Sequence, residues 1–472
     1  MAELSFEISS SQQSRPVPTE VTDPLTTPDG LEVTDHRLGS IDGTEAEGAV
    51  DGSATLFSAS TSTETLSAAQ ERISVQPPTA TRLHLNSLFW SVGVYTVSRL
   101  VLLATALVVG YLVHVSLGSE LSAFDGVWYL KLVAHGYPHI PLKTQSTLGF
   151  LPLYPMAIWA TARLSSLPPL DAGLVVSGVG GLVSALLIKR LAAGWWGERT
   201  ARYAVLAFLF FPGSVVFSMV YSEGLLIPLM VGCLLALRSR RFILAGILAS
   251  LAGIVEPVGL VAIPVCLLAA LYAMHRSIGS KGHWYSFSGY RGCSLSTARP
   301  LLAPALSTLG IGGFAIYLWV WTGTPFAAYD AQYYGWHQHS DPFRLVGHAL
   351  MVLLHGLSKL TTLHLRVHLY AINLNLVNGL LGAVFIVIAL VMLFKSKREL
   401  SVDVLAWTVG IAFLTFLSLR TPPNARMIIA AFPATLIWAR RLRKRRFVLF
   451  LTGEAVLLVL MSGLTFAGLM RP

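Results

Sequence analysis

Long apolar stretches recur along this chain, and they restrict its fold more than any other feature. Stretches of roughly 20 residues, each bounded by charged residues or by Pro and Gly, follow one another from the first third of the chain to its end. Hydrophobic residues make up 54% of the sequence and charged residues only 12%, which is outside the range of soluble domains. We therefore expect an all-α polytopic membrane protein, with residues 85–472 forming one multi-spanning domain.

The N-terminal segment, residues 1–84, has a different composition. It is rich in Ser, Thr and Pro, and it holds 13 of the 24 acidic residues but only four of the 34 basic ones. A segment with so few large apolar residues cannot bury enough surface to offset its chain entropy. We expect a disordered cytosolic tail.

The remaining charge is strongly basic, with 30 basic against 11 acidic residues after position 84. The basic residues gather at the ends of apolar stretches, as the positive-inside rule requires of cytoplasmic loops. The clusters are Lys189/Arg190, Arg238/Arg240/Arg241, Lys395/Lys397/Arg398 and Arg440–Arg446. This placement favours membrane topology over nucleic-acid binding, so no nucleic-acid partner is expected.

About 11 transmembrane helices are expected if every basic cluster is cytoplasmic and adjacent loops alternate sides. The alternation holds if residues 148–166 and 343–358 do not cross, and Pro152 and Pro155 favour an interfacial helix over the first of these. The predicted spans lie near 88–116, 170–190, 203–220, 224–237, 242–256, 257–275, 301–322, 367–394, 403–419, 427–440 and 447–469. The first span is long enough to act as an anchor, and the C-terminus is expected outside.

Most of the scarce acidic residues fall at the outer face on this topology. They are Glu120, Asp125, Asp171, Glu223, Glu256, Asp330 and Asp341. Polar chemistry is therefore expected on the extracytoplasmic side. Cys233, Cys266 and Cys293 lack metal-ligand spacing, and His337 and His339 alone do not make a metal site. We expect no cofactor and no bound metal, although metal dependence stays unresolved.

The first outer loop contains LSAFDGVWYLKLVAHGYP, residues 121–138. A short helix starting at Asp125 would place Asp125, Trp128, Lys131 and His135 on one side, at spacings of three and four residues. The alternative is that Asp125 only caps the helix, the aromatics belong to an interfacial belt, and Lys131 faces lipid phosphate.

The same stretch resembles the signature of a known family. FDGVWYLKLVAHGYP followed by GFLPLYPMAIWATARL is similar to the motif of the GPI mannosyltransferase II (PIG-V-like) family and its bacterial relatives. That resemblance implies a GT-C glycosyltransferase-like bundle with an extracytoplasmic loop helix after the first span. It also implies sugar transfer, typically of mannose, from a polyprenyl-phosphate donor.

Further segments match in the expected order. They are FFPGSVVFSMVYSEGLLIPL (210–229), GTPFAAYDAQYYGW (323–336) and RMIIAAFPATL (426–436). One position departs from the pattern, because relatives usually show Arg-Pro-x-Gly where this chain has VEPVG, with Glu256 in place of the basic residue. The departure affects what is expected for binding of the donor phosphate or of the acceptor.

The predicted roles follow from the chemistry of glycosyl transfer together with the motif. The attacking hydroxyl needs a base, and Asp125 is the predicted one; Glu223 and Glu256 are expected to bind substrate or to support the site. The leaving phosphate needs cations, which Lys131, His135, Arg420 and Arg426 can supply, although an outer arginine can also simply snorkel to headgroups. The remaining predicted substrate-binding residues are Trp128, Tyr129, Tyr154, Tyr221 and Gln332.

The main hypothesis is an inverting mannosyltransferase that acts on an envelope lipid, glycan or protein at the outer face of a bacterial plasma membrane. An endoplasmic-reticulum membrane is the alternative location. The expected partners are the lipid bilayer, the polyprenyl-phosphate-sugar donor and a glycan or lipid acceptor. Alternative functions are a GT-C enzyme for another sugar, such as arabinose or glucose, and a lipid or solute transporter.

Overall fold

The computed structural model describes residues 85–279, 298–338, 374–417 and 423–472. The predicted tail (1–84), the predicted non-crossing segment 343–358 and the predicted site residue Arg420 lie outside these residues. Within them the secondary structure is helical throughout, which confirms the all-α class expected from the apolar stretches.

The first half of the chain provides a long first helix, a cluster of short helices and a kinked helix. These elements are α2 (Leu85–Val113), α3 (Leu117–Leu121), α4 (Asp125–His135), η1 (Thr147–Gly149), α5 (Leu153–Ser165) and α6 (Pro169–Leu209). The α6 helix is bent at Gly197, whose φ of 81° is the left-handed conformation that glycine adopts without strain. The predicted span 170–190 and the first part of the predicted span 203–220 thus lie in one kinked helix, which ends at Leu209.

The middle of the chain begins with a break and continues with apolar helices. Its elements are η2 (Pro212–Ser218), α7 (Glu223–Arg238), α8 (Phe242–Gly253), η3 (Pro257–Val261), α9 (Ala262–Gly279), η4 (Arg299–Leu301), α11 (Leu302–Ser307), α12 (Leu309–Thr322), α13 (Ala327–Asp330) and η5 (Ala331–Gly335). The helices α6 and α7 pack closely because glycine faces glycine: a Cβ added at Gly180 would lie 1.7 Å from the Gly224 carbonyl oxygen.

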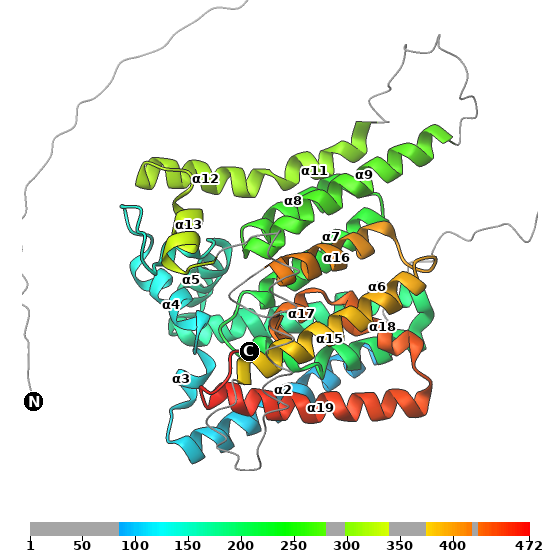
Figure 1. The fold of residues 1–472 in the computed structure, drawn as a ribbon, viewed down its shortest axis with the longest axis horizontal. Helices are drawn as coiled ribbons and strands as arrows, with labels where there is room; N and C mark the ends of the chain where they lie inside the picture. The colour runs from blue at the N-terminus through cyan, green and yellow to red at the C-terminus, as the bar shows by residue number, and fades with distance from the viewer. Residues whose placement is uncertain (1–84, 280–297, 339–373, 418–422) are drawn as a thin grey trace, which may run out of the picture. The chain divides into compact units, whose positions relative to one another are not determined.

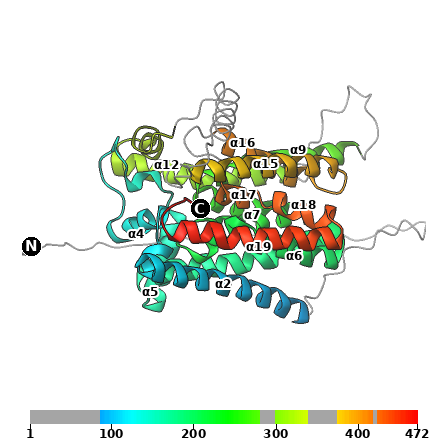
Figure 2. The same ribbon diagram turned by 60° about the horizontal axis from the view of Figure 1, so that its bottom comes forward.

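The last part of the chain returns to the same bundle. It contains α15 (Leu374–Lys395), α16 (Val402–Leu417), α17 (Ala425–Ala430), α18 (Pro433–Arg441) and α19 (Lys444–Phe466). The α18 helix packs on α6, and α19 packs on α2 and η2. Figure 1 and Figure 2 both show α2 beside α19, so the two ends of the described domain lie next to each other.

Six helices among the described residues are long and apolar enough to cross a membrane, or seven if η2 and α7 count as one bent span. The polytopic character is thus confirmed, whereas the predicted count of about 11 is not. The predicted span 242–256 is shorter in the structure, where α8 has 12 residues. The segment with Pro152 and Pro155 forms α5, a helix of 13 residues that is not among the candidate spans.

The short helices α3, α4, α5 and α13 gather at one end of the long helices (Figure 1). The basic residues Arg238 and Arg440 end helices α7 and α18, which run away from this end. This separation puts the short helices at the opposite end of the bundle from Arg238 and Arg440.

Candidate active site

The residue that organises the candidate site is Arg426, the second residue of α17. Its Nε donates to Glu223 Oε1, its Nη1 donates to Asp125 Oδ2, and its Nη2 donates to Glu256 Oε1 at 3.3 Å. The guanidinium also lies over the Tyr221 ring, 4.6 Å from the ring centroid. One arginine therefore joins three acids that are up to 131 positions apart in the chain.

Each acid lies at the start of a helix. Asp125 is the first residue of α4 and Glu223 the first of α7, while Glu256 immediately precedes η3. A carboxylate is favourable at a helix N-terminus because unpaired backbone N–H groups and the helix dipole attract negative charge. The sequence motifs thus place three carboxylates at three helix starts, and tertiary packing brings those starts to one arginine.

The three acids differ in exposure. The side chain of Asp125 is 30% exposed, that of Glu256 18% and that of Glu223 only 3%. Glu223 is therefore closed off from substrate, and Asp125 is the acid that a substrate hydroxyl reaches most readily.

The turn before Asp125 has strained backbone geometry. Phe124 has a φ of 60° and a ψ of −115°, a backbone conformation that residues other than glycine rarely adopt. Such residues cost about 1–3 kcal/mol each and cluster at functional sites. Behind the turn, Val220 N donates to the Leu121 carbonyl at 2.9 Å, and Gly126 lies against the Val220 carbonyl. The α4 start is thus fixed to the segment that leads into Glu223.

Two successive hydrogen bonds connect Tyr129 to Glu256 through Ser222. The Tyr129 hydroxyl donates to Ser222 Oγ at 2.9 Å, and Ser222 Oγ donates to Glu256 Oε2 at 3.2 Å. Burial is the main cause that raises the pKa of Tyr129 well above its usual range, so this hydroxyl keeps its proton and stays a donor. Burial, and after it the neighbouring charge of Glu223, raises the pKa of Glu256 to about 8.

A second chain fixes the segment that carries Tyr221. Tyr154 and Ser177 share a hydrogen bond of 2.7 Å between their hydroxyl oxygens. Ser177 Oγ donates to the Tyr221 carbonyl at 3.1 Å and accepts from the Tyr221 amide at 3.3 Å. Tyr154 therefore supports the site from outside the charged cluster, without contacting an acid among the described residues.

Other predicted site residues lie on a neighbouring aromatic cluster. Trp128 stacks with Phe150 at 6.1 Å and meets Trp336 edge-on at 4.9 Å, between ring centroids. Lys131 is exposed and lies over the Trp128 ring at 4.6 Å. The Gln332 amide donates to the Gly149 carbonyl at 2.6 Å, so it ties η5 to η1.

Thus the structure joins Asp125, Glu223, Glu256, Arg426 and Tyr221 directly and attaches Tyr129 and Tyr154 through serines. His135, at the end of α4, is exposed and outside this cluster. Sequence reasoning missed the two connecting serines, Ser177 and Ser222. Ser222 lies inside the quoted Tyr-Ser-Glu segment, so the motif itself marked it, whereas nothing in the sequence around Ser177 did.

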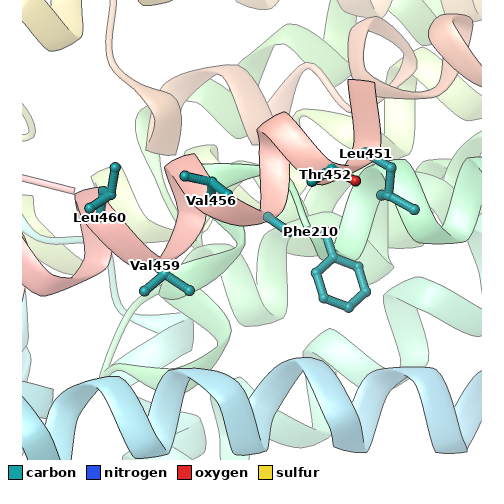
Figure 3. A pocket seen from close by; sticks show the side chains of 7 residues that line it. Phe210, Leu451, Thr452, Val456, Val459 and Leu460 are labelled. Carbon is teal, nitrogen blue, oxygen red and sulfur yellow. The ribbon is translucent and has the colours of Figure 1, made fainter. Parts of the chain in front are cut away.

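Two further observations concern ligands. In the described part of the chain, no group of three or more His, Cys, Asp and Glu residues has the arrangement of a metal site. A cavity of about 540 Å³ lies on the flank of α19 and is lined almost entirely by apolar side chains, from Phe210 and from residues 451–460 (Figure 3). It shares no residue with the charged cluster.

Residues 92–288 match the model of the family described as Mannosyltransferase (PIG-V). The match confirms the family resemblance read from the sequence. It supports a membrane glycosyltransferase. The matched region includes Asp125, Glu223 and Glu256 but ends before Arg426, so the arginine that joins the three acids lies outside it.

A search of curated proteins found no match. Among solved structures, apo ArnT from Cupriavidus metallidurans is similar at a TM-score of 0.42 and 16% identity, with 78% of this chain and 75% of that chain covered. The apo oligosaccharyltransferase of Archaeoglobus fulgidus is similar at a TM-score of 0.45 and 14% identity. The match covers 80% of this chain and 56% of that one, so this chain spans little more than half of its length.

Proposed function

We propose that this glycosyltransferase has a GT-C-like architecture and transfers mannose from a polyprenyl-phosphate donor to a hydroxyl of an envelope lipid, glycan or protein. The observation that carries the proposal is the position of Asp125. Arg426 holds the Asp125 carboxylate in place, and the Asp125 side chain is nevertheless the most exposed of the three acids. A fixed and accessible carboxylate is what a general base requires.

In the proposed reaction, the acceptor oxygen attacks C1 of mannose while the bond from C1 to the phosphate oxygen breaks. Asp125 takes the proton of the attacking hydroxyl, and the polyprenyl phosphate leaves with the bonding electrons. Attack on the face opposite the leaving group inverts the configuration at C1. The role of Arg426 in this scheme is to orient Asp125, because Nε, Nη1 and Nη2 each contact a carboxylate.

The leaving phosphate needs positive charge that is free of carboxylates. Lys131 and His135 are exposed on α4, the helix that begins with Asp125, and they remain our proposed phosphate contacts together with Arg420. Arg426 could take part only by sharing its remaining N–H groups. The mannose specificity rests on the family description, and the outward orientation rests on the basic clusters at the opposite helix ends. A bacterial plasma membrane is the proposed location.

The test is transfer of labelled mannose by the purified protein in lipid vesicles, with polyprenyl-phosphate-mannose as donor and membrane glycolipids as acceptors. Asp125→Asn should reduce transfer by at least about 10²-fold, the lower range for loss of a general base. Asp171→Asn is the control, because Asp171 lies in the first turn of α6 and outside the charged cluster.

Equal transfer by Asp125→Asn and wild type would contradict the assignment of the base. Transfer by the wild type only from a glucose or arabinose donor would replace mannose with that sugar. No transfer from any lipid-linked donor would contradict the proposed donor class.

A further inference from the structure

An arginine inside the first candidate span contacts the break between α6 and α7. Arg99 Nη1 donates to the Ser214 carbonyl at 2.6 Å and to Ser218 Oγ at 3.1 Å. Its Nη2 donates to Ser214 Oγ at 3.2 Å and to the Leu209 carbonyl at 3.4 Å. Arg99 therefore contacts the last residue of α6, Leu209, and two residues of η2, Ser214 and Ser218.

These contacts are of an unusual kind for a charge within a span. Among the described residues no carboxylate pairs with Arg99; the guanidinium is satisfied by carbonyls and hydroxyls and lies between the Tyr95 and Phe217 rings, 5.3 and 5.8 Å from their centroids. An arginine at membrane depth is costly and is found where it serves a function. Here its donors reach two backbone carbonyls at the helix break, and the Leu209 carbonyl also accepts from Ser214 Oγ at 2.7 Å.

The segment η2, which Arg99 contacts, lies next to both residues of the ion pair between Glu223 and Arg426. On one side, η2 packs on α17 so closely that a Cβ at Gly213 would lie 2.1 Å from the carbonyl oxygen of Ala425, the residue before Arg426. On the other side, the chain reaches Glu223 five residues after η2 ends at Ser218, and Tyr221 and Ser222 lie just before it. Glu223 and Arg426 are thus both set by the position of η2.

We infer that Arg99 is a positioning residue of the transfer site: by holding η2 it fixes the distance between Glu223 and Arg426, and through Arg426 it orients Asp125. The inference rests on the proposed function for its kinetic consequence. Its structural content, that Arg99 holds residues 209–224 in place, stands independently of which sugar is transferred.

The kinetic test compares Arg99→Lys and Arg99→Met with wild type. Lysine keeps the charge but has no fork to reach Ser214 and Leu209 together. For Arg99→Met we expect kcat to fall about 10²-fold, the effect of a small misplacement of reacting groups, with an unchanged KM for the donor. The kcat of Arg99→Lys should lie between that of Arg99→Met and that of wild type.

Arg238→Met provides a matched control. Arg238 of α7 also donates to a backbone carbonyl of α6, that of Gly194 at 2.6 Å, but it does so at the end of α7 remote from Glu223. Its loss should lower stability without lowering kcat. An equal loss of kcat in Arg238→Met would show that any weakened α6–α7 contact impairs transfer, and would overturn the specific role of Arg99.

Hydrogen exchange gives a readout that does not depend on activity. The amides of Ser214, Val220 and Tyr221 are hydrogen-bonded in the segment that Arg99 holds. In Arg99→Lys, peptides covering 209–224 should exchange faster than in wild type, while peptides of α8 keep their rates. Unchanged exchange in 209–224 would overturn the inference even if transfer were lost, and faster exchange in a protein that transfers no mannose would contradict only the proposed function.

A double-mutant cycle distinguishes positioning from general destabilisation. If Arg99 acts through the pair of Glu223 and Arg426, then Arg99→Lys should cost little further kcat once Glu223→Gln is present. Purely additive losses would overturn the inference.

Discussion

Arg426 Nη2 lies 3.3 Å from Glu256 Oε1, so the acid of the VEPVG segment, where the resemblance predicts a basic residue, is paired with an arginine from another helix. Glu256 is therefore not an isolated buried group. It adds a third carboxyl group to a guanidinium that already contacts Asp125 and Glu223.

The first prediction concerns pH and stability. Glu256 lies between α8 and η3, and burial, and after it Glu223, raise its pKa from 4.5 to about 8. Between these two values the folded state keeps a proton that the unfolded state has lost, so the free energy of unfolding should fall as pH rises. Glu256→Gln cannot titrate and should lose this part of the slope.

Thermal unfolding of both proteins in lipid nanodiscs, from about pH 4.5 to about pH 8, measures the difference. The wild-type midpoint should decline relative to that of Glu256→Gln across the window. Parallel curves would show that Glu256 titrates alike in the folded and unfolded states.

The second prediction concerns the central cation. Arg426→Gln removes the partner of three carboxylates at once, and breaking a buried ion pair from one side costs about 3–5 kcal/mol. We expect a lower unfolding midpoint and loss of mannose transfer, because Asp125 is no longer held. Adding Glu223→Gln removes the most buried of the stranded charges. The double variant should recover part of the midpoint but none of the transfer. Recovery of transfer would mean that Arg426 serves only to balance charge.

The sequence predicted the members of this site better than their arrangement. Asp125, Glu223 and Glu256 were identifiable because ionisable residues at membrane boundaries are rare and because two of them lie in recognisable motifs. That one arginine would contact all three was not predictable, since it depends on how α17 packs against η2 and α7. The sequence predicted contact between Arg426 and a phosphate but did not predict its contacts with the three acids.

The fold shows the same division. Apolar length predicted where helices occur, and the motif predicted a helix starting at Asp125, which is where α4 starts. The number of crossings was less certain from sequence, because breaks such as η2 divide apolar runs without a change in composition. Arg99 illustrates the reason, because it lies on α2 and donates to carbonyls at the break between α6 and α7. The sequence around Leu209–Ser218 contains no pattern that predicts this contact.

The third prediction uses the close crossing beside Glu223. A Cβ at Gly224 would lie 2.6 Å from the Ser177 Cα, in rigid backbone that cannot give way. Gly224→Ala should therefore push α7 from α6, displace Glu223 and abolish most transfer. Gly453→Ala is the control, since a Cβ there meets nothing within 4 Å in the middle of α19. It should keep full transfer. Wild-type activity in Gly224→Ala would show that the crossing tolerates an expansion that its geometry forbids.

The fourth prediction separates the two members of the chain beneath Glu256. Tyr129→Phe deletes one hydrogen bond and leaves Ser222 free to donate to Glu256, so the cost in stability should be about 0.5–1.5 kcal/mol, with transfer nearly retained. Ser222→Ala removes the donor of Glu256 and also strands the buried Tyr129 hydroxyl, so it should cost more in both stability and transfer. Adding Tyr129→Phe to Ser222→Ala removes the stranded hydroxyl and should restore stability without restoring transfer. Chemical unfolding and mannose transfer on the three variants measure this order, and a Tyr129→Phe loss as large as that of Ser222→Ala would instead place the tyrosine hydroxyl itself in the reaction.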